Sequence, residues 1–264
     1  MRITFASVAC VLIISSMFAV LIACKNKEAG GEPKNTKAYT ERGKRFQRSK
    51  QHDKALADHG KAIELEPGFA EAYNNRARVY KDLKQYEKAI ADYNKSIELD
   101  PKYIDAYINR GLFYKDLNQE AKALADFDKA IELDPSNAKA YDNRGYGYAH
   151  FLQYDKALAD FNRAIEIDRK FAKAYRNRGV VYSKQKQYDK AIADYNKVIE
   201  LDPDYATAYN NLAGAYAKVG HYQEAIKAEE RAIELLKQQD GDEDKIERYR
   251  KHLESYKAHK PFRE

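Results

Sequence analysis

The stretch AEAYNNRARVYKDLKQYEKAIADYNKSIELDPKY, residues 70–103, decides how this 264-residue chain folds. Its apolar and small residues recur at spacings of three, four and seven, the pattern of one face of an α-helix. Two such groups flank Lys84-Gln85. Asp100-Pro101 closes the unit, because helical geometry is disfavoured for the residue before a proline. The stretch therefore predicts two short helices, A and B, joined by a tight turn.

The same pattern returns every 34 residues along most of the chain. Self-similarity at this period is typical of a solenoid, in which each helical hairpin buries its apolar face against its neighbours. We therefore expect an all-α solenoid of six hairpins, at residues 36–69, 70–103, 104–137, 138–171, 172–205 and 206–239.

Small residues at two positions of the unit predict how closely helices A and B approach. Positions are numbered from the first residue of each unit. In three of the units that have glycine at position 8, we expect it to face the alanine at position 20. Because glycine inside a helix costs about 1 kcal/mol relative to alanine, close packing of the two helices is the expected compensation. The pairs are Gly111 with Ala123, Gly145 with Ala157 and Gly179 with Ala191.

The unit resembles the tetratricopeptide repeat, which has aromatic residues at positions 4 and 24, small residues at 8, 20 and 27, Tyr at 11 and Pro at 32. One unit matches at all of these positions, with Tyr107, Gly111, Tyr114, Ala123, Phe127, Ala130 and Pro135. The departures elsewhere are local: Glu120, Arg169, Val198 and Glu229, and His52 and His59 in the first unit, which we expect to be a solvent-facing end. The resemblance implies a right-handed superhelix that binds proteins and has no chemistry or cofactor of its own.

An arginine at position 7 and an aspartate at position 23 change together between the copies. In the sixth unit both are replaced, by Leu212 and Ala228. Such covariation within one chain predicts a salt bridge from helix A to helix B inside each of the other five units. The expected pairs are Arg42 with Asp58, Arg76 with Asp92, Arg110 with Asp126, Arg144 with Asp160 and Arg178 with Asp194.

Residues 1–23 form an apolar segment that begins with one arginine. Its length suits either a transmembrane anchor or a secretion signal. It ends in Leu-Ile-Ala followed by Cys24, which resembles a bacterial lipobox and favours the signal. By that resemblance Cys24 is the lipidated first residue of the mature chain, and 24–35 is a flexible tether. Lys25 stands where enteric lipoproteins held in the inner membrane have Asp, so we expect a lipid anchor in the outer membrane, facing the periplasm of a bacterial cell envelope.

The segment after the repeats, residues 240–264, is expected to cap the last hairpin. Ile246, Tyr249, Leu253 and Tyr256 form one helical stripe. Asp242 suits the start of a helix, and Pro261 suits its end. We prefer this interpretation to that of a partner-binding helix.

Several function classes are disfavoured by the sequence. Its 47 Lys and Arg residues are interspersed with 41 Asp and Glu residues, without the basic stripe that follows nucleic-acid phosphates. It has no phosphate-binding glycine loop, GxSxG or HExxH motif, and its histidines lack partners at metal-ligand spacing. We expect no catalytic residue, no metal and no nucleic-acid partner.

The groove of the superhelix is the expected binding site. Helical geometry places positions 2, 5, 6, 9, 12 and 13 of helix A opposite the packed face. Position 6 is asparagine in five units, and a row of amides can pair with the backbone of an extended peptide, with little effect of its own on stability. Alternatively, the repeated asparagine reflects recent duplication of the unit and the consensus of the family, without a binding role. Predicted binding residues are Asn75, Asn109, Asn143, Asn177 and Asn211, with a basic patch of Lys139, Lys173, Arg176 and Lys184 that favours acidic peptides.

Three functions therefore compete. The first is a membrane-anchored adaptor that holds a protein or extended peptide within an envelope assembly. The second is a structural brace of a pilus, secretion or outer-membrane assembly machine. The third is a cell-wall enzyme or a regulator of one, and the missing catalytic set disfavours intrinsic activity.

The lipid anchor can be tested at Cys24. Cys24→Ala should abolish labelling by an alkyne fatty acid and shift the chain out of its normal membrane fraction, because acylation needs the thiol and stable anchoring needs several chains. Cys10→Ala is the matched control and should label normally. Equal labelling of both variants would revive the transmembrane anchor.

Overall fold

The computed structural model describes residues 35–239 and 242–259, so Cys24 and the predicted signal lie outside the described residues. Within those ranges the chain forms thirteen helices and no strand. They are α2 (Thr36–Arg48), α3 (His52–Leu65), α4 (Ala70–Asp82), α5 (Tyr86–Leu99), α6 (Ile104–Asp116), α7 (Glu120–Leu133), α8 (Ala138–His150), α9 (Tyr154–Ile167), α10 (Ala172–Lys184), α11 (Tyr188–Leu201), α12 (Ala206–Lys218), α13 (Tyr222–Gln238) and α14 (Glu243–Lys257). In the same ranges every helix is too short or too polar to cross a bilayer.

Each A helix ends in the same way. The residue at position 15 takes a left-handed conformation in all six units, with φ between 55° and 84°, although only Gly220 is a glycine. In the second unit the next amide, of Gln85, donates to the Tyr80 carbonyl over 2.8 Å. This is a common way to end a helix and to satisfy its last carbonyls. In five units the turn between A and B is therefore formed without the glycine that usually occupies this left-handed position.

The hairpins pack as closely as expected, but against a different partner. A Cβ at Gly111 would lie 2.8 Å from the ring of Phe127 and 3.2 Å from the Ala123 carbonyl. Gly145 and Gly179 stand in the same way against Phe161 and Tyr195. Position 8 is therefore small mainly to seat the aromatic ring at position 24, and the expected contact with the alanine at position 20 is present at Gly111 through the Ala123 carbonyl.

The five predicted salt bridges are all present. In the third unit, Nε and Nη2 of Arg110 donate to the two carboxylate oxygens of Asp126 over 2.9 and 2.6 Å. The guanidinium carbon lies 5.9 Å from the ring centre of Tyr107 and 5.8 Å from that of Tyr114, so two tyrosines frame it. The other four pairs have the same geometry. Each pair ties helix A to helix B.

The paired aspartates are buried. Asp126 is 5% exposed. Burial raises the pKa of its carboxyl, and the two bonds from Arg110 oppose that rise. A buried carboxylate costs several kcal/mol of hydration, which an ion pair offsets only with good geometry. The bidentate contact supplies that geometry.

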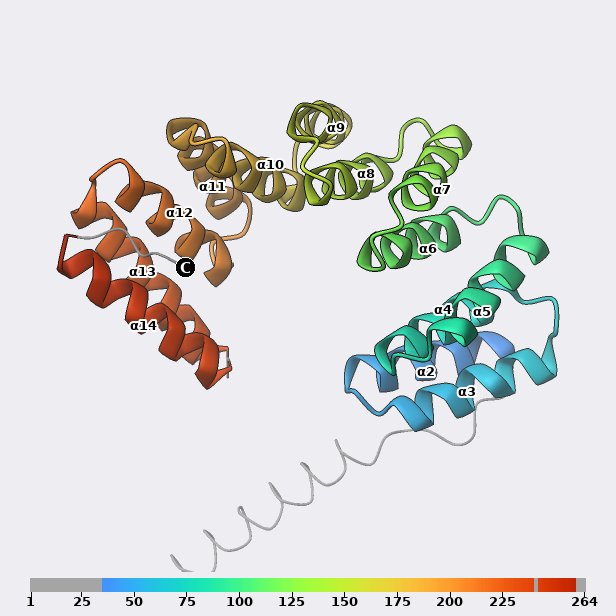
Figure 1. The fold of residues 1–264 in the computed structure, drawn as a ribbon. Coiled ribbons are helices and arrows are strands. Elements are labelled where there is room, and N and C mark those ends of the chain that lie inside the picture. The colour runs from blue at the N-terminus through green and yellow to red at the C-terminus, as the bar shows by residue number, and fades with distance from the viewer. Residues whose placement is uncertain (1–34, 240–241, 260–264) are drawn as a thin grey trace, which may run out of the picture.

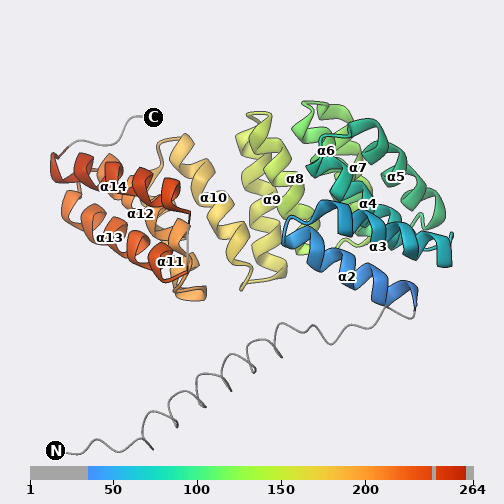
Figure 2. The same cartoon turned by 90° about the horizontal axis from the view of Figure 1, so that it is seen from below.

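The hairpins follow one another along a curved path, with α2 and α3 at one end and α13 and α14 at the other (Figures 1 and 2). Successive A helices touch: α2 contacts α4, and the contacts continue through α6, α8 and α10 to α12. Successive B helices have no comparable contacts among the described elements. Since elements come closest on the inside of a curve, the A helices line the inner side of the array.

Helix α14 covers the last hairpin by packing on α13. Ile246, Tyr249 and Tyr256 from the predicted stripe are buried. Glu229, which replaces the aromatic at position 24, is fully buried in the same place. Its Oε1 lies 3.2 Å from Nδ1 of His252 on α14. Burial raises the pKa of Glu229 and the contact with His252 opposes the rise, so this departure from the repeat pattern serves the cap.

The first hairpin is less open to solvent than expected. His59 at position 24 is completely buried, with Gly43 directly against its ring. Burial lowers the pKa of His59 to about 4, so the imidazole is neutral and replaces the usual aromatic ring in the core. The expectation of a solvent-facing end is thus wrong for this side chain.

The buried pair can be tested with substitutions that the sixth hairpin already contains. Arg110→Leu should lower the free energy of unfolding by about 3–5 kcal/mol, because it leaves the Asp126 carboxylate buried without its partner. Asp126→Ala should cost less, since the guanidinium is partly exposed and also bonds Asn94. The double variant, melted in parallel, should lose less than the two single losses combined. Strictly additive losses would contradict the coupling.

Candidate partner-binding surface

The inner surface is formed by positions 2, 5, 6, 9, 12 and 13 of the A helices. Along it, position 9 changes in character from one end of the array to the other. It is basic in the first two units and apolar or glycine in the next four: Lys44, Arg78, Leu112, Tyr146, Val180 and Gly214. A partner that lies along this row meets charge at one end and apolar side chains in the middle.

Tyr146 and Val180 are the exposed apolar side chains of this row. They are 41% and 37% exposed and come from neighbouring A helices, α8 and α10. The Tyr146 ring has a fixed neighbour, because Nζ of the buried Lys115 lies 4.3 Å from the ring centre and also binds Asp116. A ring held this way offers contact area to a partner at little entropic cost.

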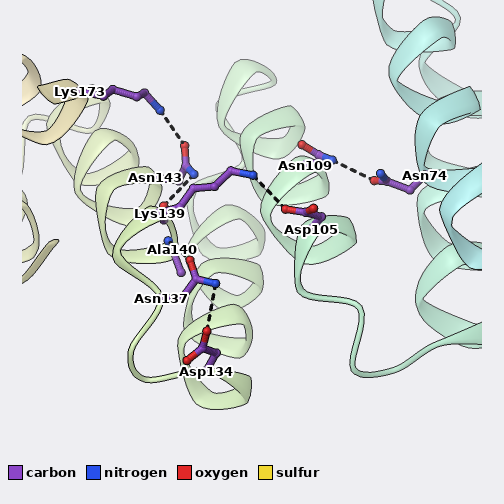
Figure 3. A network of polar contacts seen from close by, with 9 residues as sticks. All are labelled: Asn74, Asp105, Asn109, Asp134, Asn137, Lys139, Ala140, Asn143 and Lys173. Atoms are coloured by element: carbon purple, nitrogen blue, oxygen red, sulfur yellow. Dashed lines mark hydrogen bonds and ion pairs between the residues drawn. The ribbon is translucent and has the colours of Figure 1, made fainter. Parts of the chain in front are cut away.

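The position-6 asparagines bond mostly to the array itself, as Figure 3 shows for two of them. Nδ2 of Asn109 donates to Oδ1 of Asn74 in the preceding unit over 3.0 Å. Asn177 donates in the same way to Asp142 over 2.8 Å. Asn143 donates to the Lys139 carbonyl of its own helix over 2.8 Å.

These bonds differ from the free row of amides that the sequence suggested. Asn75, Asn143 and Asn177 are at most 5% exposed. Asn109 and Asn211 are half-buried. Buried amides that join one hairpin to the next support the stacking of the units. Their role toward a partner stays a prediction.

Two of the four cations of the predicted basic patch are paired with carboxylates of the array. Lys139 pairs with Asp105 over 2.9 Å, across to the preceding unit (Figure 3). Lys173 pairs with the buried Asp142 over 2.8 Å. Arg176 donates to the Tyr205 hydroxyl and to Asn177. Lys184 is exposed.

Two of the four predicted cations are therefore neutralised, while Arg176 and Lys184 keep their positive charge, and binding of an acidic peptide here stays a prediction. The described part of the chain also holds no group of three or more His, Cys, Asp or Glu residues that could bind a metal ion.

Comparison with known protein families agrees with the repeat geometry. A tetratricopeptide repeat family matches residues 70–103, 104–137 and 172–205. A TPR repeat family matches residues 153–186, and a further tetratricopeptide repeat family matches residues 194–227. The chain belongs to the tetratricopeptide repeat proteins. Arrays of this repeat are generally non-catalytic scaffolds for protein interactions. A comparison with curated protein sequences finds no significant match.

Solved structures with the same architecture include PilW and pilF. PilW, described as a widely conserved type IV pilus biogenesis factor, has a TM-score of 0.66 at 23% identity, over 74% of this chain and 91% of that one. The pilF protein of Pseudomonas aeruginosa has a TM-score of 0.64 at 17% identity, over 85% of this chain and 97% of that one.

The match to the APC/C hetero-tetramer Cut9-Hcn1 has a TM-score of 0.66 at 18% identity, over 77% of this chain. This chain spans 41% of the length of that one. At these identities the three likenesses show the fold alone.

The structural role of the asparagines gives a prediction for stability. Asn177→Ala should lower the free energy of unfolding by about 1–3 kcal/mol, because it leaves Oδ1 of the buried Asp142 without its donor. Asn196→Ala is the matched control, since this exposed amide of α11 has no hydrogen bond within the described residues, and its loss should cost less than about 0.5 kcal/mol. Equal melting of the two variants in denaturant would mean that the bond to Asp142 contributes nothing.

Proposed function

We propose that this protein is a non-enzymatic adaptor, anchored to a membrane through a lipid on Cys24. It holds a protein or an extended peptide against its inner surface within a bacterial cell-envelope assembly. The array supplies the scaffold, and the sequence before it supplies the anchor. Both are needed for a partner to be held at the envelope surface.

The observation that carries the proposal is the exposed pair Tyr146 and Val180 in the middle of the inner surface. The nearby cations Lys139 and Lys173 are neutralised by carboxylates of the array. Apolar contact is therefore the main attraction that this region offers. Removing apolar surface from water contributes roughly 25 cal/mol per Å², so covering the exposed parts of these two side chains favours binding.

The anchor limits where the array works. Residues 24–35 span at most about 40 Å when fully extended, at about 3.4 Å per residue. The first hairpin therefore stays within that distance of the membrane that holds Cys24. A lipoprotein signal, a short tether and an interaction scaffold together favour a role at the envelope surface, in the outer membrane facing the periplasm.

The inner surface can be tested by capture from detergent-solubilised envelopes with the full-length chain. Tyr146→Ser combined with Val180→Ser should reduce recovery of the partner at least tenfold, since about 1.4 kcal/mol of lost contact is already a factor of ten. Leu65→Ser combined with Leu152→Ser is the matched control, because these side chains are 50% and 71% exposed at the end of α3 and in the α8–α9 turn. The control should capture as the wild type does.

The composition of the captured material separates the candidate functions. One stoichiometric protein supports the adaptor. Several subunits of one pilus, secretion or outer-membrane assembly machine would favour the structural brace, and a peptidoglycan hydrolase would favour regulation of a cell-wall enzyme. Equal capture by all three forms of the chain would overturn the assignment of the inner surface.

A further inference from the structure

A hollow of about 260 Å³ lies between the first two A helices, at the amino-terminal end of the inner surface. We call it the arginine pocket. Its lining comes from positions 9, 12 and 13, the groove positions that helical geometry predicts. The lining residues are Lys44, Gln47 and Arg48 of α2 and Arg78 and Asp82 of α4.

Two of the three cations that line the pocket have no carboxylate bonded to them. Lys44 is neutralised by Glu41 and Glu71. The Asp82 carboxylate accepts a hydrogen bond from Nε2 of Gln47 over 2.8 Å, which fixes it at the edge of the pocket. Arg48 and Arg78 are exposed, and neither has an ion-paired or hydrogen-bonded carboxylate within residues 35–239 and 242–259. Two guanidinium groups therefore border one hollow with a single carboxylate among the lining residues.

The rest of the inner surface is arranged differently. Lys81 pairs with Asp116 over 2.6 Å. Lys139 pairs with Asp105, and Lys173 pairs with Asp142. In each of these contacts a cation of one unit meets a carboxylate of the adjacent unit. Arg176 and Lys184 also lack a carboxylate partner, but in the pocket two arginines without such a partner line one hollow.

We propose that the arginine pocket binds the carboxylates of an acidic segment in the partner protein. Guanidinium groups form bidentate, charge-assisted bonds to carboxylates, and two of them can hold two neighbouring acidic side chains. The hollow has room for such groups and is too small for a folded element. The inference deepens the proposed function by naming the chemistry of the partner at one end of the groove.

The position-9 row gives the segment a direction. It starts with the basic side chains of α2 and α4 and reaches Tyr146 and Val180 on α8 and α10. An extended partner segment therefore carries its acidic residues over the first two hairpins and an apolar residue over the fourth and fifth. This differs from the sequence-based expectation, which placed the acid-binding patch at Lys139, Lys173, Arg176 and Lys184.

The test uses the full-length chain in neutral detergent and a fluorescein-labelled hexaglutamate peptide, followed by anisotropy at low salt. Arg48→Gln combined with Arg78→Gln should weaken binding at least tenfold. Arg248→Gln combined with Arg250→Gln on α14 removes the same two charges at the opposite end of the array and should bind as the wild type does. Added salt should erase the difference, because exposed charges are screened within about 10 Å at 0.1 M.

Each outcome has one meaning. Equal binding by the two double variants overturns the pocket, because the peptide then responds to net charge alone. Competition by inorganic phosphate, or by vesicles of phosphatidylglycerol, as strong as that by unlabelled hexaglutamate also overturns it, in favour of a free anion or a lipid headgroup. Matching thermal melts show that the variants are folded, as expected for exposed side chains, of which only Arg250 has an ion pair, with Glu247 of its own helix.

The probe needs neither the natural partner nor the lipid, so its result is independent of the proposed function. Tyr146→Ser with Val180→Ser should bind hexaglutamate as the wild type does. If the arginine variant also binds normally while capture still depends on Tyr146 and Val180, the pocket alone is rejected. If capture fails to depend on Tyr146 and Val180 but hexaglutamate binding still needs the two arginines, the proposed use of the central surface is rejected instead.

Discussion

The fold depends on one type of buried ion pair, between arginine and aspartate, which recurs in five hairpins. In each of the first five hairpins an arginine of helix A donates two hydrogen bonds to a buried aspartate of helix B. The guanidinium lies between two tyrosine rings of the same A helix or, in the first hairpin, between a tyrosine and a phenylalanine ring. A buried carboxylate without its partner is costly, so the two helices of a unit are held in one relative position. The sixth hairpin replaces the pair with Leu212 and Ala228. Its B helix is covered by α14, where Glu229 and His252 supply a different polar contact.

Stacking of the hairpins relies on a second set of polar contacts, between residues 34 or 35 positions apart. Asn109 bonds Asn74, Asn177 bonds Asp142, and Lys139 pairs with Asp105. These groups lie on the side of the array where a partner would bind. The same side chains therefore cannot be counted freely as binding groups, since their donors and charges already serve the solenoid. The proposed recognition therefore uses positions that this network leaves open, the apolar centre and the arginine pocket.

A regular scaffold with a varied inner row suits a protein that recognises one extended partner. In the second to fifth hairpins the packed positions hardly change, because each seats an aromatic ring at position 24 and the same ion pair. Position 9 is free of that constraint and differs in every unit. Specificity can thus be altered along the array without disturbing the hairpins, which is a general advantage of repeat architectures.

The sequence by itself determined the period, the two helices of each unit and the arginine–aspartate pairs, because these features are local and recur in every copy. It also indicated the stripe of α14 that covers the last hairpin. Only the tertiary structure decided that glycine at position 8 seats the ring at position 24 and that Glu229 contacts His252. It also decided that Asn109 and Asn177 donate to the preceding unit. The same holds for Arg48 and Arg78, which come from different units. Contacts between units depend on the angle at which hairpins stack, and that angle follows from the packing of whole surfaces, which no short motif encodes.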